Sequence, residues 1–254
     1  MVTEDDRYPL PHIHDCNGRL AGMCVFSVVD LVRGFHQIPM AEEDIAKTAI
    51  ITPFGLFEFI RMPFGLKNAA QAFQRLMDGI LREVDCAFVY LDDILIASPD
   101  EQTHLHDLRK IFGLLDAHGI SINRKKCVFG KPQVKYLGHM VGHLGISPLP
   151  SRVDNLKQFP PPTSKLGLQP FLGMLNYYRR FVPGLALVLA PLHQAVAAAT
   201  TPKKFVWTPQ CEEAFSSAKS KLATATLLRH PSPFAETAVT VDASDIAIGA
   251  ELSQ

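Results

Sequence analysis

The sequence has no net charge, because its 25 lysine and arginine residues balance its 25 aspartate and glutamate residues. A global electrostatic attraction to nucleic acid is therefore excluded, and any such attraction must come from a local patch. The chain also lacks an apolar run of about 18 residues, so no membrane span is expected. Its polar start has no signal peptide. These absences predict an intracellular protein, cytoplasmic or nuclear, without a membrane partner.

Cysteine is also scarce. The five cysteines are scattered, odd in number and without CxxC spacing, which favours a reducing compartment and argues against a zinc site. The sequence has no internal repeat and no low-complexity tract. Its 47% hydrophobic and 20% charged residues are typical of a soluble globular protein. A chain of 254 residues can form one large domain or two to three small ones.

Two adjacent aspartates, Asp92 and Asp93, stand between two apolar runs in the stretch 87–97. Each run is typical of a short buried strand, so the stretch predicts a hairpin with the acids at or near its turn. Neighbouring carboxylates raise each other's pKa, and burial opposes their ionisation further. A bound divalent cation removes this conflict, and oxygen ligands suit magnesium. The alternative is a solvent-exposed acidic turn, since aspartate is common in turns.

The surrounding pattern predicts an α+β fold. A buried strand is expected over 23–31, and a hairpin is expected from the runs 47–52 and 56–60 around Pro-Phe-Gly. Apolar residues three and four apart predict amphipathic helices over 67–84 and 100–118. For the second helix the apolar positions are Leu105, Leu108, Ile111, Phe112 and Leu115, with Ser98 or Asp100 as the cap and Gly119 as the stop. This order describes a mostly antiparallel sheet with helices on one face.

A domain boundary is predicted between Pro148 and Pro162. Five prolines fall in these fifteen residues, a density that suits neither a sheet centre nor a helix interior. Beyond the boundary, helices are predicted over 169–181 and within 205–228, the latter opened by a Thr-Pro pair at 208–209. A strand pair is predicted in 237–252. The polar residues 1–22 make a poor start for a domain.

Asp30 is a third acid of interest because it closes the apolar strand predicted over 23–31. Alone, it is better explained as a helix cap or a turn residue. Together with Asp92 and Asp93, it predicts a different chemistry. Three acids at strand ends can converge at one sheet edge and hold two magnesium ions about 3.5–4 Å apart. Such a pair supports in-line phosphoryl transfer to a 3′-hydroxyl.

A series of motifs runs in order along nearly the whole chain: FSVVDL (26–31) with GFHQI (34–38), MPFGLKNA (62–69) with Phe73, Gln74 and Met77, YLDD (90–93), YLGH (136–139), FLG (171–173) with NYYRRF (176–181), and VDAS (241–244) with Gly249 and Ala250. In these motifs the sequence resembles the reverse transcriptases of gypsy (Ty3-like) long-terminal-repeat retrotransposons. The resemblance implies an RNA-directed DNA polymerase belonging to a pol polyprotein, truncated at both ends.

The implied fold is a right-hand polymerase palm with partial fingers, a thumb and a connection, followed by a truncated start of an RNase H-like domain. The implied limits are 1–147 for partial fingers and palm, 148–204 for a thumb-like helical segment, 205–235 for the connection and 236–254 for the RNase H-like start. Asp242 matches the first RNase H acid. The other acids of that site would lie beyond Gln254, so no RNase H activity is expected.

The resemblance also implies the residues of the polymerase site. Asp30, Asp92 and Asp93 would be catalytic and would bind two Mg²⁺ ions (Mn²⁺ being possible), with Leu31 as a further metal-binding position. Phe35 would lie under the incoming sugar and exclude a 2′-hydroxyl, the alternative being an ordinary core phenylalanine. Deoxynucleoside triphosphates would also meet two further residues, Phe64 and Gly65, although Gly65 is equally natural as a turn glycine.

A primed RNA or DNA template is the implied macromolecular partner, together with other pol polyprotein domains. Its expected contacts are Tyr90, Tyr136, Leu137, Gly138, Lys125 and Lys126. The last two belong to the segment 124–135, which holds five basic residues and no acid and suits phosphate contacts, although a charge run is more often a solvated face. The Tyr-Tyr-Arg-Arg run at 177–180 also suits nucleic acid, the alternative being that its tyrosines belong to the core.

Two alternatives stay open. Family members carry a longer basic segment before the region that matches Tyr8, where this chain has only Arg7. This difference, with the short RNase H-like part, fits a catalytically impaired retroelement remnant or a domesticated nucleic-acid-binding protein. Another two-metal nucleotidyltransferase with a different template is the second alternative, and the similarity after residue 130 argues against it.

Overall fold

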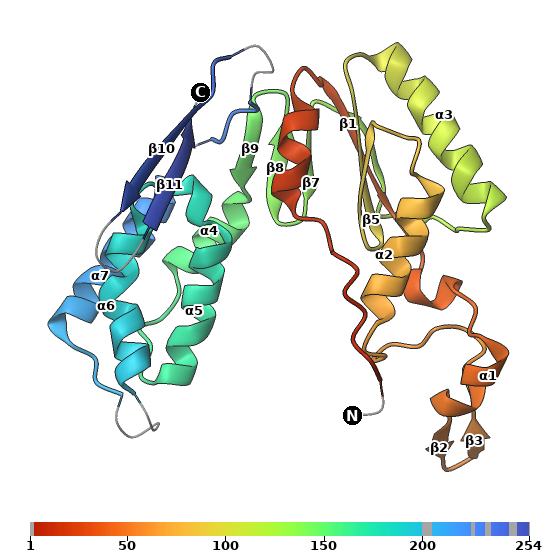
Figure 1. Cartoon of the computed structure of the whole chain (residues 1–254), viewed down its shortest axis with the longest axis horizontal. Coiled ribbons are helices and arrows are strands. Elements are labelled where there is room, and N and C mark those ends of the chain that lie inside the picture. Colours follow the sequence, from red (N-terminus) through yellow and green to blue (C-terminus); the bar gives the residue numbers. More distant parts are fainter. Residues whose placement is uncertain (1–2, 200–204, 225–226, 232–234, 244–247, 254) are drawn as a thin grey trace. The chain divides into compact units, whose positions relative to one another are not determined.

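The computed structural model describes residues 3–199, 205–224, 227–231, 235–243 and 248–253. The chain forms two compact units, residues 1–136 together with 231–254, and residues 137–230 (Figure 1). Within these described ranges, no helix is both long enough and apolar enough to cross a membrane.

Among the described residues, the first unit is built on a four-stranded sheet in the order β4-β5-β1-β6. Its strands are β1 (Val25–Asp30), β4 (Ala87–Tyr90), β5 (Asp93–Ser98) and β6 (Val128–Lys131). All three strand pairs are antiparallel, as predicted. The central pair is in register over its whole length, from Val25 opposite Ser98 to Asp30 opposite Asp93. The two predicted strands of the acidic hairpin are therefore confirmed as β4 and β5.

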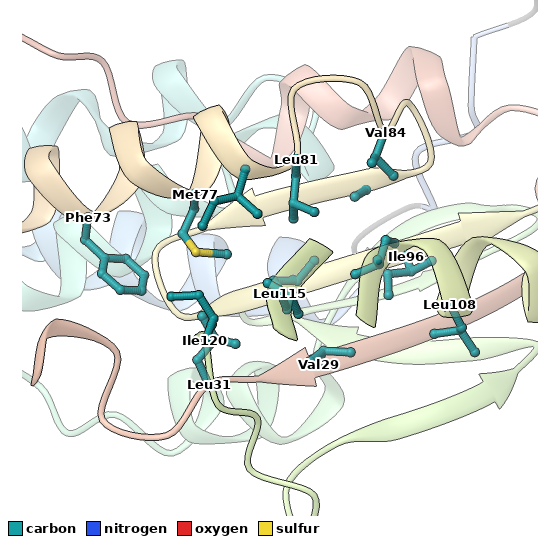
Figure 2. Packing of buried hydrophobic residues seen from close by; sticks show 14 of the residues in the cluster. Val29, Leu31, Phe73, Met77, Leu81, Val84, Ile96, Leu108, Leu115 and Ile120 are labelled. Atoms are coloured by element: carbon teal, nitrogen blue, oxygen red, sulfur yellow. The ribbon is translucent and has the colours of Figure 1, made fainter. Parts of the chain in front are cut away.

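Two helices, α2 (Ala69–Ile80) and α3 (Glu101–Ala117), share one apolar core with this sheet (Figure 2). α2 contributes Phe73 and Met77, α3 contributes Ile111 and Leu115, and the strands contribute side chains such as Val29. Both helices therefore pack on the same sheet face, as the sequence predicted. Burying large apolar side chains is worth about 1.5–3 kcal/mol each, so this core fixes the strand register.

The ends of the helices follow capping chemistry. Asp100 caps α3 by accepting the Thr103 N–H at 2.9 Å, and Gly119 follows the helix with a φ of +68°. Of the two caps considered, Asp100 is correct, because Ser98 belongs to β5. The predicted α2 was too long at both ends, since only residues 69–80 are helical.

Leu105 was wrongly placed on the buried face of α3, because it is 55% exposed. The buried stripe runs instead through His104, Leu108, Ile111 and Leu115. Steps of four, three and four keep these side chains in line on a helix of 3.6 residues per turn. Two successive steps of three, from Leu105 to Ile111, rotate away from that line. A polar residue therefore occupies a place that hydrophobicity alone assigned to leucine.

The first unit contains further elements outside this layer. The region 1–22, predicted to be a poor start, contains the 3₁₀ helix η1 (Ile13–Leu20) with Ile13, Cys16 and Leu20 buried. The hairpin predicted around Pro-Phe-Gly is confirmed but short, and its Ile51 and Phe54 are 88% and 90% exposed. The remaining elements are η2 (Gly34–Gln37), α1 (Glu42–Ile45), η3 (Ala46–Thr48), β2 (Ile50–Thr52), β3 (Gly55–Phe57), β7 (Gln133–Tyr136), and the antiparallel pair β10 (Ala238–Ala243) and β11 (Ile248–Ser253), which was predicted.

The second unit is mainly helical. Its elements are β8 (His139–Gly142), β9 (Gly145–Pro148), α4 (Pro150–Lys157), α5 (Lys165–Tyr177), η4 (Arg179–Phe181), α6 (Leu185–Ala198) and α7 (Pro209–Ala223). The proline-rich segment 148–162 does contain a helix, contrary to the prediction. Pro150 occupies the first turn of α4, where it removes no needed N–H, and the next proline follows the helix end. Thr208 and Pro209 open α7 as predicted, with the Cys211 N–H donating to Thr208 Oγ1 at 3.2 Å.

Candidate active site

Two of the three predicted acids meet across the centre of the sheet. Asp30 ends β1 and Asp93 begins β5, and their Cα atoms are direct partners in the antiparallel ladder. The third acid follows closely, because the Leu31 N–H donates to the Asp92 carbonyl oxygen at 3.0 Å. Asp92 itself is exposed in the β4–β5 turn. The structure therefore brings the predicted acids together at the ends of the two central strands, β1 and β5.

Gln74 of α2 is hydrogen-bonded to the backbone of this turn. Its Oε1 accepts the Leu91 N–H at 2.8 Å, and its Nε2 donates to the Val89 carbonyl at 3.0 Å and to Asp78 Oδ1 at 2.8 Å. Leu91 has a φ of +52°, a strained value for a leucine. Sequence reasoning quoted Gln74 in a motif but gave it no role. The sequence offered one signal, a glutamine next to Phe73 in a predicted amphipathic helix. In the structure this glutamine is fully buried.

The electrostatics of the acids are unfavourable as they stand. Burial, and then the charges of Asp92 and Asp30, raise the pKa of Asp93, while Lys126 opposes the rise. The Asp30 carboxylate is 17% exposed, and its Oδ2 lies 3.4 Å from Lys126 Nζ. Its Oδ1 is buried and receives no hydrogen bond from any described residue. A buried carboxylate oxygen without a donor, facing a second acid, fits a divalent cation. Within the described ranges, however, no three His, Cys, Asp or Glu residues are grouped closely enough to form a metal site.

An aromatic cluster lies beside the acidic turn. The Phe35 ring meets Phe64 at a centroid distance of 5.7 Å and Phe73 at 5.6 Å, both edge to face. A Cβ on Gly34 would lie 3.0 Å from the Asp92 Cβ and 3.1 Å from the Phe73 ring, so a larger residue here would force these neighbours to shift by a few tenths of an ångström. Sequence reasoning quoted Gly34 in a motif but gave it no role. Gly65 has a φ of +90° and no described atom near its missing Cβ, as a turn glycine would.

The predicted nucleic-acid contacts fall in different settings. Tyr90 is half-buried at the end of β4, and Lys125 is exposed on the basic segment 124–135, as is Lys126. Tyr136 is buried, and its hydroxyl donates to the Phe88 carbonyl at 3.1 Å, so its ring packs inside the first unit. In the second unit, Leu137 and Gly138 form a turn in the left-handed region, with φ values of +45° and +76°. Asp242 lies on β10 opposite Gly249, and its side chain is outside the described part of the structure.

The family model described as "Reverse transcriptase (RNA-dependent DNA polymerase)" matches residues 1–141, which include Asp30, Asp92 and Asp93. The chain belongs to the reverse transcriptase family. The resemblance stated from the motifs is thereby confirmed. A second model, described as "RNase H-like domain found in reverse transcriptase", matches residues 207–254 of this reverse transcriptase chain.

Curated relatives of this reverse transcriptase chain are retrotransposon polyproteins. The chain is 38% identical over 257 residues to the retrovirus-related Pol polyprotein from transposon 297 of Drosophila melanogaster, covering 100% of the chain and 24% of the relative. The Pol polyprotein from transposon opus of the same species is 39% identical, with 100% and 26% covered. The transposon Tf2-3 polyprotein of Schizosaccharomyces pombe is 33% identical, with 97% and 18% covered. The chain thus spans about a quarter or less of the length of these relatives.

Solved structures support the same fold for this reverse transcriptase. A foamy viral protease-reverse transcriptase in complex with an RNA/DNA hybrid matches with a TM-score of 0.85 at 22% identity, covering 98% of this chain and 36% of that one. The same viral enzyme in complex with double-stranded DNA matches with a TM-score of 0.83 at 23% identity, covering 96% and 50%. The predicted α+β polymerase fold is confirmed. Reverse transcriptases as a family use divalent metal ions.

Proposed function

We propose that this chain is the RNA-directed DNA polymerase part of a retrotransposon pol polyprotein and transfers deoxynucleotides to a primer 3′-hydroxyl. The observation that carries the proposal is Asp30 opposite Asp93 at the turn end of the β4–β5 hairpin, in a chain of the reverse transcriptase family. Other pol domains would be its neighbours in the longer protein, as the lengths of the relatives suggest.

Asp30, Asp92 and Asp93, with Leu31 beside them, would hold two Mg²⁺ ions, or Mn²⁺ in their place. The ions would activate the primer hydroxyl and neutralise charge on the triphosphate. The support on this chain is the raised pKa of Asp93 and the buried Asp30 Oδ1, which accepts no hydrogen bond from any residue that the structure describes. Asp92 is exposed, so its carboxylate is free to turn towards the other two.

Phe35 would exclude ribonucleotides by volume. Its ring is fixed by edge contacts to Phe64 and Phe73, and the preceding residue, Gly34, lies close to the Asp92 side chain. A ring held on two sides cannot move away from a 2′-hydroxyl, so the steric selection would be sharp. Phe64 is 68% exposed and, with Gly65, would face the nucleotide or the template base.

The primed template would contact Tyr90, Lys125 and Lys126 in the first unit and the turn Leu137–Gly138 in the second. Lysines can neutralise phosphates without reading sequence. Tyr136 would contribute through its backbone, because its ring is buried. The proposed domain limits stay as 1–147, 148–204, 205–235 and 236–254, with Asp242 as a vestigial RNase H acid. The complexes of the foamy viral enzyme with RNA/DNA hybrid and DNA support this class of partner.

The test is Mg²⁺-dependent primer extension on an RNA template. Asp92→Asn should lower extension on the order of 100-fold or more, because it removes a charge that the metal site needs. Asp116→Asn, a change of the same chemistry at an exposed acid on α3, should extend like wild type. Equal extension by wild type and Asp92→Asn would reject the assignment. Tight primer–template binding without any extension would favour an impaired remnant, and preference for a DNA template would favour another nucleotidyltransferase.

A further inference from the structure

The turn Leu137–Gly138 stands immediately before β8 and has an unusual backbone. Both residues have positive φ, +45° at Leu137 and +76° at Gly138. The left-handed region is disfavoured for a residue with a Cβ, so Leu137 needs support from its surroundings. A Cβ on Gly138 would lie 3.2 Å from the Tyr178 hydroxyl, so the turn is also tightly enclosed. The shape of this turn is therefore imposed by its neighbours.

Those neighbours occupy both carbonyl groups of the turn completely. The Leu137 carbonyl accepts the Tyr177 hydroxyl at 2.5 Å and His139 Nδ1 at 2.8 Å. The Gly138 carbonyl accepts the Tyr178 hydroxyl at 3.0 Å and the Leu149 N–H at 3.2 Å. Each carbonyl oxygen has two lone pairs, and here each receives two donors. Each of the two consecutive tyrosines donates its hydroxyl hydrogen to one of these carbonyl groups.

The donors are themselves held in place. Tyr177 is the last residue of α5, and Tyr178 is its C-cap, so both side chains project from a helix end. His139 is fully buried between the rings of Tyr177, Tyr178 and Phe181, at centroid distances of 5.1, 5.4 and 5.4 Å. Burial lowers the pKa of His139, which favours the neutral ring, and the contact with the Leu137 carbonyl oxygen assigns the proton of that ring to Nδ1. This aromatic cluster therefore presents fixed hydroxyl groups to the turn.

We propose that Tyr177 and Tyr178 are positioning residues for the primer strand: their hydroxyls lock the Leu137–Gly138 turn in its binding shape. The inference rests on the proposed function, which gives this turn to the primer. A turn that is already ordered binds without a further loss of backbone entropy. Because its carbonyl oxygens accept hydrogen bonds, their partial negative charge also repels an approaching phosphate less. Sequence reasoning left these tyrosines open between core packing and direct nucleic-acid contact, and the hydrogen bonds support a third role.

The binding test uses Tyr177→Phe, Tyr178→Phe and the double variant, which remove only the hydroxyls. Tyr8→Phe is the matched control, because its hydroxyl donates to Asp78 at 2.7 Å in the other unit. Fluorescence anisotropy with a labelled DNA primer on an RNA template, without nucleotides, gives Kd. Each single variant should bind about three- to tenfold more weakly, and the double variant more weakly still. With saturating primer–template, kcat should stay within about twofold of wild type.

Amide hydrogen exchange separates positioning from direct contact. Peptides covering 136–142 should exchange faster in the double variant without nucleic acid and remain unchanged in Tyr8→Phe. Weaker binding without faster exchange would mean that the hydroxyls contact nucleic acid directly, and would overturn the proposal. Faster exchange with unchanged Kd would overturn it in favour of a purely structural role.

Failure of the proposed function has a different signature. If wild type binds primer–template but does not extend it, the polymerase assignment fails, while the Kd differences still support the tyrosine lock. If wild type does not bind primer–template at all, the turn is not a primer-binding element and the proposal is overturned.

Discussion

At the scale of single residues, Asp93 is held in a setting that opposes its charge. Burial and the two neighbouring acids raise its pKa above the ordinary 3.8. At neutral pH the ionised group therefore destabilises the metal-free fold, and this effect disappears as the pH falls and Asp93 is protonated. Asp93→Asn should raise the thermal midpoint without divalent cation by a few degrees while abolishing extension. Differential scanning fluorimetry with EDTA measures the shift, and a lower midpoint would contradict it.

Gln74 gives the second prediction at this scale. Gln74→Leu would leave the Leu91 N–H and the Val89 carbonyl without their partner. Buried groups left unpaired cost about 1–3 kcal/mol each, so the unfolding free energy should fall by about 2–4 kcal/mol and extension should fall with it. Gln71→Leu is the control on the same helix, because Gln71 Oε1 is buried and accepts no hydrogen bond from any described group. Urea unfolding should show Gln71→Leu as neutral or slightly stabilising, and equal losses would contradict the turn-holding role.

The residues that sequence reasoning could assign are those whose chemistry is visible in their own neighbourhood. Asp30 and Asp93 stand at the ends of apolar strands, and strand ends meet at a sheet edge. The roles of Gln74 and Gly34 could not be assigned, because their partners are distant in sequence. Gln74 binds Leu91 in a turn 17 residues away, and Gly34 lies against the ring of Phe73, 39 residues away. Lys126 was predicted for phosphate contact, and its ion pair with Asp30 depends on the fold in the same way.

At the scale of elements, α3 is joined to the sheet by a buried polar network. His104 Nε2 lies 2.6 Å from Ser27 Oγ on β1, and its Nδ1 lies 2.9 Å from Ser98 Oγ on β5. Ser98 also donates to Asp107 at 2.6 Å. The network explains why a histidine occupies the buried stripe of the helix. An apolar pattern cannot reveal this, because the two serines that satisfy the ring lie on strands.

The same network predicts an acid-sensitive fold. Burial lowers the pKa of His104 below its ordinary 6.5, although Asp107 opposes the change. The unfolded chain then binds the proton more readily, so stability should fall as the pH drops below about 6.5. Urea unfolding from pH 7.5 to 5 should show a smaller loss for His104→Gln than for wild type. His139, whose pKa is also lowered, remains in both proteins. The exposed neighbour variant His106→Gln should lose stability as wild type does, and matching slopes in all three would refute the role of His104.

At the scale of the whole chain, each compact unit has its own buried aromatic centre. Phe73 belongs to the first, and Phe171, stacked near Phe159 and Phe215, belongs to the second. Truncating a buried phenylalanine to alanine costs about 3–5 kcal/mol. Phe73→Ala and Phe171→Ala should therefore shift different calorimetric transitions. A single transition lowered equally by both variants would show that the units unfold together.

The order of helices and strands could be predicted from apolar periodicity, and the family could be predicted from several motifs along the chain. The sequence predicted the hairpin around Pro-Phe-Gly but not that the apolar side chains of Ile51 and Phe54 are exposed there. Nor did it anticipate η1, because a polar 3₁₀ helix with three buried side chains has no strong apolar period.

The pairing of β1 with β5 has one more consequence. Side chains alternate along a strand, so sliding one strand by a single residue would turn Val29 and Ile94 out of the apolar layer and separate Asp30 from Asp93. The apolar core and the pairing of the two acids thus depend on the same strand register. Substitutions of exposed residues would leave this pairing intact. An insertion or deletion of one residue within either strand would shift the register, and would disrupt the apolar core and the acid pair together.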